Sequence, residues 1–259
     1  MLRPRIIPCL LVRNKGLVKT IKFGTSKYVG DPINAVKIFN EKEVDELIVL
    51  DIDATTTGSG PDFGMIQKIA AECRMPLCYG GGVKTVEQAK VIIGLGVEKV
   101  ALSAAVLENP ALVTQIAAEI GCQSVVVVLD VKKRLFGSSY EIHTHNAKVK
   151  TGKCPIEFAQ TLEKLGVGEV VINSIDNDGE MCGYDLAIAK KVREKIRLPM
   201  TVLGGAGSLK DIGNLISNFG VVGAAAGSIF VFKGIYKAVL INYPSSTEKE
   251  ALIRNNYPL

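Results

Sequence analysis

The chain alternates between short apolar runs and longer segments that mix apolar and polar residues. About eight runs have the length and β-branched content of strands buried on both faces, as in a parallel sheet. They cover residues 5–12, 46–53, 76–79, 97–102, 123–133, 169–174, 198–203 and 221–226. The intervening segments predict helices, because several open on an N-cap residue, a proline or a capping box. We expect helices from Pro32, at 61–73, after Thr85, from Pro110, at 155–165, 184–195, after Ser208, at 229–240 and at 246–254.

Strict alternation of strands and helices predicts a (β/α)8 TIM barrel, with a doubly wound open sheet as the second choice. An internal repeat separates the two, because the chain matches itself at an offset of roughly 120 residues. The segments YGGGVKT and LGGAGSL are one such pair. Two similar half-barrels explain the repeat, so we expect one barrel domain over residues 1–259. Residues 13–30 are expected to form a polar loop and residues 134–152 a hairpin.

The run at 123–133, QSVVVVLDVKK, carries a single acid, Asp130. Parallel α/β folds place their chemistry at the carboxyl ends of such strands. Asp130 could equally cap the strand or begin a turn, and its position alone does not separate the two roles.

Two glycine-rich turns, at residues 80–82 and 204–207, stand between a strand and a capped helix in each half. Glycines let backbone N–H groups approach a ligand, and a helix N-terminus favours an anion. Small residues follow at the next strand ends, Ser103-Ala104 and Gly227-Ser228. One such turn is more often just a tight turn. The matched pair favours two phosphate sites on opposite sides of one barrel mouth, for a ligand with a phosphate at each end.

Composition narrows the function classes. The net charge of +5 comes from scattered lysines, which does not indicate nucleic-acid binding but suits small anions. No apolar run is long enough to span a membrane. The six cysteines form no C-x-x-C pair and are expected to be buried free thiols of a cytoplasmic protein. With only two histidines, we expect neither a metal site nor a cofactor.

These motifs together resemble one family, HisF, the cyclase subunit of imidazole glycerol phosphate synthase. The resemblance covers essentially the whole chain and rests on RIIPCL, VGDP, DELIVLDI, GGG, VEKVAL, ENP, SIDNDG, GYD and GGAG. It implies a barrel that docks a glutaminase subunit, HisH, on its bottom face. Ammonia from that subunit crosses the barrel and adds to a bisphosphorylated formimino-carboxamide ribulosyl nucleotide, which cyclises to imidazole glycerol phosphate and AICAR.

The resemblance also implies roles for individual residues. Of two cooperating catalytic aspartates, one matches Asp130. The expected substrate and phosphate contacts are Lys19, Asp51, Gly81, Gly82, Ser103, Asp178, Gly179, Gly205, Gly227 and Ser228. A ring of Arg5, Glu46, Lys99 and Glu169 is expected to gate the ammonia passage, although charges at strand starts are more often simply solvated. Glu98 and Gln123 match positions that face the glutaminase.

The second catalytic aspartate is missing. The family has CLDV in its first strand, whereas this chain has Cys9-Leu10-Leu11-Val12. Leu11 is also the counterpart of Asp130 in the internal repeat. Leucine cannot transfer a proton, and the loss of an acid–base group commonly costs about 10²–10⁴-fold in rate. Ser103-Ala104, where the family has Asn-Thr, and Leu203 are further departures.

Three hypotheses follow. The chain is the cyclase subunit, or it is a cyclase-impaired ammonia conduit that supplies a separate amidotransferase, such as one that makes amidino sugars for surface polysaccharide. A phosphosugar isomerase resembling HisA is the weakest, because the gate residues and SIDNDG are HisF-like.

Overall fold

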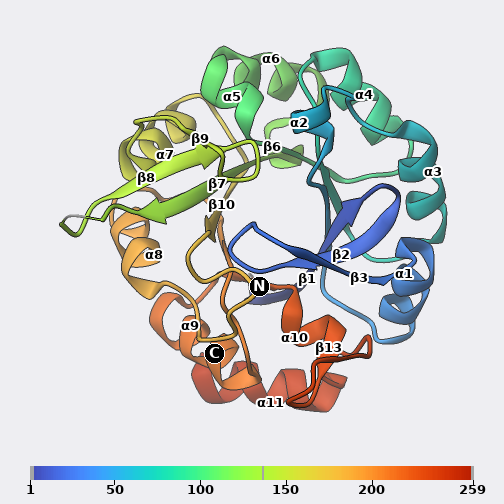
Figure 1. The fold of residues 1–259 in the computed structure, drawn as a ribbon. Helices are drawn as coiled ribbons and strands as arrows, with labels where there is room; N and C mark the ends of the chain where they lie inside the picture. Colours follow the sequence, from blue (N-terminus) through green and yellow to red (C-terminus); the bar gives the residue numbers. More distant parts are fainter. Residues whose placement is uncertain (1–2, 136, 258–259) are drawn as a thin grey trace.

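The computed structural model describes residues 3–135 and 137–257. Within this part of the chain, eight parallel strands close into a barrel in the order β1-β4-β5-β6-β7-β10-β11-β12 and back to β1 (Figure 1). They are β1 (Arg5–Arg13), β4 (Leu47–Asp51), β5 (Leu77–Gly80), β6 (Lys99–Leu102), β7 (Val125–Lys133), β10 (Glu169–Ser174), β11 (Met200–Leu203) and β12 (Gly223–Ala226). The predicted (β/α)8 barrel is confirmed, because the β10–β7 and β1–β12 pairings close the ring of eight barrel strands.

Helices surround the barrel, as Figure 1 shows. The longer ones are α1 (Pro32–Glu41), α3 (Phe63–Glu72), α4 (Val86–Gly94), α6 (Ala111–Ile120), α7 (Pro155–Lys164), α8 (Leu186–Arg193), α9 (Leu209–Phe219) and α11 (Ser246–Asn256). Shorter ones are α2 (Ala54–Thr57), α5 (Ala104–Glu108), α10 (Ser228–Val231) and the 3₁₀ turn η1 (Cys122–Ser124). The predicted capping boxes at Thr85 and Ser208 are present, and Asp31 caps α1 ahead of Pro32.

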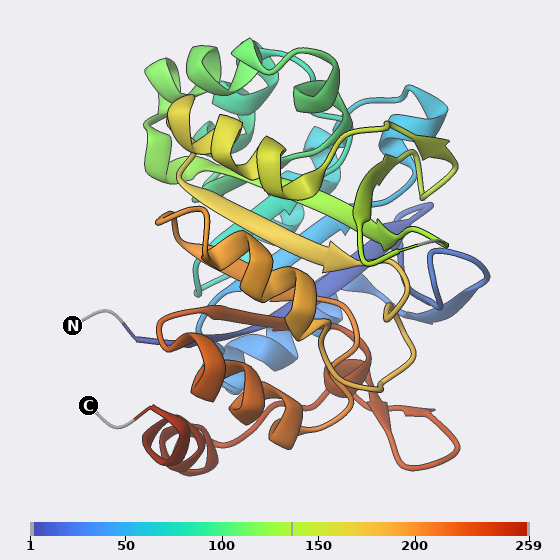
Figure 2. The ribbon, with the colours of Figure 1, turned by 90° about the vertical axis from the view of Figure 1, so that its left-hand side faces the viewer.

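The two halves are built alike. Each contributes four barrel strands and places an antiparallel hairpin after its first strand. In the first half this is β2 (Gly16–Thr20) with β3 (Ser26–Gly30), and in the second β8 (Tyr140–Thr144) with β9 (Val149–Lys150). Both hairpins lie on the side toward which the barrel strands run (Figure 2). The half-barrel repeat in the sequence is therefore a repeat in the fold.

Alternation along each strand separates two apolar layers. On β1, Ile6, Leu10 and Val12 pack outward against the helices, whereas Ile7, Cys9 and Leu11 point into the barrel. The inner layer is completed by Ile48, Cys78, Ala101, Val126, Val128, Val171, Leu203 and Ala225, with Val18 from β2. The barrel interior is thus an apolar column.

Three local predictions are wrong. The helix expected at 229–240 stops after Val231 and gives way to the hairpin of β13 (Phe232–Lys233) and β14 (Ala238–Val239), because Gly234 and Lys237 reverse the chain with positive φ. The loop expected at 13–30 is the β2–β3 hairpin, because Leu17 and Val18 pair with β1 and are buried there. Of the cysteines expected to be buried, Cys122 and Cys182 are exposed. No helix of the described chain is both long and apolar enough to span a membrane.

Candidate active site and bottom ring

One cavity opens at the carboxyl ends of the barrel strands. Every residue predicted for catalysis or phosphate binding lines it: Lys19, Asp51, Gly81, Gly82, Ser103, Asp130, Asp178, Gly179, Gly205, Gly227 and Ser228. The glycine turns follow β5 and β11, which are four strands apart in the barrel order and therefore opposite each other. The cavity thus has the two-ended form that the sequence predicts.

Asp130 lies near the end of β7, beside β10. Asn173 of β10 donates a hydrogen bond from Nδ2 to Asp130 Oδ1 at 2.8 Å. Burial raises the pKa of Asp130 to about 7, the bond from Asn173 opposes that rise, and the charge of Asp178 adds to it. A carboxyl group that titrates near neutral pH can either give or take a proton.

Leu11 faces Asp130 across the mouth, because β1 and β7 are also four strands apart. Its side chain points into the barrel and is 9% exposed. Leu50 of the neighbouring strand β4 is in register with Leu11, and both line the cavity. The wall at Leu11, across from Asp130, is therefore apolar at the position where the resemblance implies a second carboxylate.

Lys19 reaches into the cavity from β2 and is 7% exposed. Its Nζ lies so close to Gly227 that a β-carbon there would stand 1.8 Å from it. The following loop is tied to the turn after β10: Thr20 Oγ1 donates to Asp178 Oδ2 at 2.7 Å, and Lys22 N donates to the Asp178 carbonyl oxygen at 2.9 Å. These bonds hold Lys19, the only described lysine that is buried within the cavity, beside the predicted phosphate contact at Gly227.

Glycine is required at the centre of both glycine-rich turns. Gly81 has φ +137°, and an added β-carbon would lie 2.7 Å from the Asp51 carbonyl oxygen. Gly205 has φ +108°, and an added β-carbon would lie 2.1 Å from the Gly183 carbonyl oxygen. Side chains are excluded at both places, which leaves backbone N–H groups as the ligand-facing surface.

Asp51, at the end of β4, is largely committed to the backbone. Its Oδ1 accepts hydrogen bonds from Asp53 N and Ala54 N, both at 3.1 Å. Burial raises its pKa, while these two bonds act in the opposite direction. Asp51 therefore organises the turn into α2 with one oxygen and can offer the other to a ligand.

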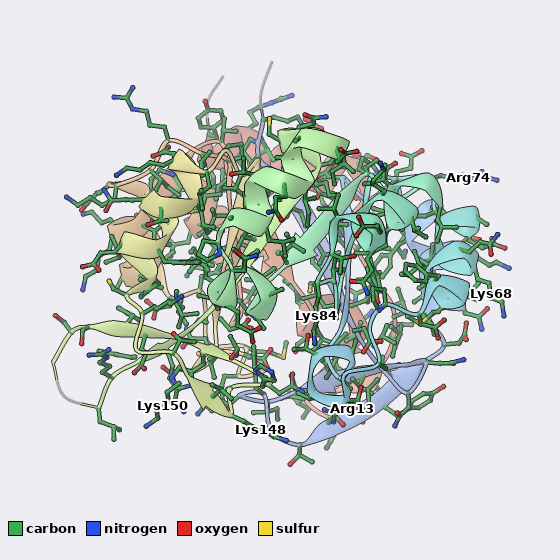
Figure 3. All side chains as sticks on the ribbon, turned by 90° about the horizontal axis from the view of Figure 1, so that it is seen from above. Arg13, Lys68, Arg74, Lys84, Lys148 and Lys150 are labelled. Atoms are coloured by element: carbon green, nitrogen blue, oxygen red, sulfur yellow. The ribbon has the colours of Figure 1, made fainter. Side chains whose placement is uncertain are left out.

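The cavity also contains polar residues that the sequence analysis did not select. Arg13 makes a two-pronged ion pair with Asp53 at 2.8 and 3.1 Å, and Asn146 donates to the same carboxylate at 3.3 Å. His145 lies beside Asn146 and also lines the cavity, as does Lys84. Figure 3 shows Arg13 at the edge of the molecule that carries the mouth, near Lys148. The strand-end rule that selected Asp130 also applies to Asn173 and to Arg13, the last residue of β1, whereas nothing local marks Asn146 and His145.

The four residues predicted as a gate form a closed ring at the opposite end of the barrel. Lys99 Nζ contacts Glu46 Oε1 at 2.8 Å and Glu169 Oε2 at 2.9 Å. Arg5 contacts Glu169 at 2.6 Å and also pairs with Glu46. Burial alone would raise the pKa of Glu169, but Arg5 and Lys99 hold it at about 2. The alternating charges therefore pair rather than stand solvated.

Glu98 and Gln123 lie on the same bottom face as this ring. Glu98 precedes β6 and Gln123 lies in η1 just before β7, and both are exposed. Glu98 accepts a hydrogen bond from Leu77 N at 2.6 Å, which fixes its carboxylate beside the start of β5. Both positions are accessible around the ring.

Comparisons with known proteins agree with this geometry. The family described as "Histidine biosynthesis protein" matches residues 5–237. The chain is 61% identical over 250 residues to the Vibrio vulnificus protein designated hisF3, with 96% of each chain covered. It is 49% identical to the Pseudomonas aeruginosa protein designated hisF2, with 94% and 97% covered. It is 36% identical to the imidazole glycerol phosphate synthase subunit HisF of Lactococcus lactis, with 100% and 96% covered. The chain therefore belongs to the histidine biosynthesis protein family and, within it, to the HisF group.

Proposed function

We propose that the chain is a HisF-type subunit of a glutamine amidotransferase in which the ammonia path is kept and the cyclase chemistry is impaired. A HisH-like glutaminase would dock on the face that carries Glu98 and Gln123. Ammonia would enter through the ring of Arg5, Glu46, Lys99 and Glu169 and leave at the mouth. A separate acceptor enzyme would then use it.

The observation that carries the proposal is the contrast between the two ends of the barrel. At the bottom, all four charged residues are present and paired. At the mouth, Asp130 faces Leu11, so a side chain that can transfer a proton is present on one side and missing on the other. A cyclase would be expected to need both groups, whereas a conduit needs only the path.

The barrel interior supports passage of neutral ammonia. Between the ring and the mouth the inward side chains are apolar, and several are small, such as Cys9, Cys78, Ala101 and Ala225. An ammonium ion would have to leave water in such surroundings at high cost, while neutral NH3 would not. The column thus favours the form of the nitrogen that is nucleophilic.

Cyclisation of the bisphosphorylated nucleotide is the alternative function. It is favoured by the cavity itself, which unites Asp130, Lys19 and both glycine turns. An acid near neutral pKa could carry part of the chemistry alone.

A direct assay separates the two functions. Cyclisation is measured with saturating ammonium salt and no glutaminase, for the wild type and Leu11→Asp. The proposal expects very slow turnover that Leu11→Asp raises by about tenfold or more. Leu50→Asp, which adds a carboxylate elsewhere in the same cavity, is the matched control and should give no gain. Wild-type turnover equal to that of a HisF with both aspartates would refute the proposal.

A further inference from the structure

The β13–β14 hairpin gathers several exposed apolar side chains on the mouth side of the barrel. Ile235 is 87% exposed and Tyr236 88%, at the turn between the two short strands. Val239 on the returning strand and Leu240 directly after it are also exposed. Figure 2 shows this segment projecting beyond the barrel on the side where the strands end. Large apolar side chains gathered at one tip mark an interaction site more often than scattered ones do.

The base of the hairpin is held in place. Asn242 Nδ2 donates to the Ile229 carbonyl oxygen at 3.1 Å and to the Leu240 carbonyl oxygen at 3.0 Å. Lys27 of β3 donates to the Lys237 carbonyl oxygen at 3.3 Å, and its Nζ lies 5.2 Å from the centroid of the Phe232 ring. The tip is therefore presented on a supported base, which lowers the entropy lost when a partner binds.

A groove connects this hairpin to the cavity. Met181, Phe232 and Ile235 line the groove together with Gly207 and Ser208, and Met181 lines the mouth cavity as well. A partner seated on the hairpin would therefore reach the edge of the opening from which ammonia would leave. The hairpin tip alone is smaller than a stable interface of roughly 800 Å² per partner, so the groove and the rim must contribute area.

The hairpin and the segments that flank it carry charge of one sign. Residues 229–247 contain Lys233 and Lys237 and no acid. Both lysines flank the exposed Ile235 and Tyr236. Electrostatic complementarity then calls for a partner with an apolar pocket and acidic side chains around it.

We propose that the β13–β14 hairpin and its groove are the docking surface for the ammonia-consuming enzyme, which would present an apolar pocket rimmed by acids. This inference rests on the proposed function. Ammonia released into neutral water is protonated and loses its nucleophilicity, so delivery requires an acceptor that covers the mouth and excludes water. The hairpin and groove are continuous with that mouth.

The test uses an extract of source cells that do not make this chain. It follows the amide nitrogen of glutamine into the products that the extract forms. The chain is added back with its glutaminase and amide-¹⁵N glutamine, and ¹⁵N in products other than ammonia is measured beside glutamine hydrolysis. Ile235→Ser with Tyr236→Ser should lower transfer by at least about tenfold and leave hydrolysis unchanged, as expected for the apolar centre of an interface. Leu135→Ser, an equally exposed apolar residue on another hairpin, should change neither.

Each other outcome overturns a distinct claim. Equal transfer by the wild type and the double variant refutes the docking surface but not the conduit. Hydrolysis without any transfer by the wild type refutes delivery to a second enzyme and the docking surface with it.

A wild-type dimer in light scattering that the double variant abolishes would assign the surface to a second copy of this chain. Weaker inorganic phosphate binding by the double variant would make the hairpin part of the ligand site. Unchanged transfer by Lys233→Glu with Lys237→Glu would exclude the acidic rim.

Discussion

Replacing Asp130 with asparagine should stabilise the protein, and more so as the pH rises. The pKa of Asp130 is raised by burial to about 7 from the ordinary value of 3.8. In the unfolded chain the group ionises near its ordinary pKa, while in the folded protein it stays protonated up to about 7. Between these two values the unfolded state binds fewer protons, so stability falls with rising pH.

The magnitude follows from the same shift, at about 1.4 kcal/mol for each pH unit between the two pKa values. The cost of keeping Asp130 in place is about 1.5 kcal/mol at pH 5 and about 4 kcal/mol at pH 8. Asparagine has the same shape, still accepts the hydrogen bond from Asn173 and does not ionise. The variant should therefore gain about 2.5 kcal/mol over the wild type between pH 5 and pH 8.

Urea unfolding at pH 5, 6, 7 and 8 measures this difference. Glu180→Gln, which neutralises an exposed acid, is the control and should show no comparable trend with pH. A stability difference between wild type and Asp130→Asn that stays constant over this range would refute the assignment of Asp130 as a group that titrates near neutrality.

Two further variants test the ring and the phosphate turns. Lys99→Met leaves Glu46 and Glu169 buried with Arg5 alone, so it should cost about 2–4 kcal/mol in urea unfolding. Lys90→Met, which breaks the exposed pair with Glu119, should leave the free energy of unfolding nearly unchanged, and equal losses in the two variants would mean that the ring is solvated. Gly205→Ala should weaken inorganic phosphate binding in calorimetry and cost about 1–3 kcal/mol of stability. Gly96→Ala, at φ +96° with the nearest atom 3.9 Å from the added β-carbon, should strain the backbone without affecting phosphate, and parallel losses in both variants would contradict a local role for Gly205.

The barrel could be predicted because its signals are local and repeated. The valine run of β7 needs burial on both faces, and Thr85 and Ser208 begin their helices with capping boxes that four residues suffice to define. The internal repeat then favoured a closed barrel of two similar halves over an open sheet. The same logic placed both glycine turns at one mouth, because parallel strands end on one side.

The failures have physical causes as well. The segment 229–240 is apolar enough for a helix, but most of it forms a hairpin because Gly234 and Lys237 adopt positive φ. Lys27 of β3, which is distant in the sequence, also holds the turn through its hydrogen bond to the Lys237 carbonyl oxygen. Asn146 and His145 enter the cavity only because the β8–β9 hairpin folds over it. Their proximity to the site is set by tertiary packing and leaves no mark on nearby sequence.

The claim that the ammonia path is kept and the cyclase is impaired is tested most directly by the ratio of glutamine hydrolysed to imidazole glycerol phosphate formed. The chain is combined with its HisH-like glutaminase, glutamine and the bisphosphorylated nucleotide, and glutamine hydrolysed is compared with imidazole glycerol phosphate formed. A conduit with an impaired cyclase predicts that hydrolysis exceeds product formation by on the order of 10²-fold or more. One product molecule for each glutamine hydrolysed would contradict the account.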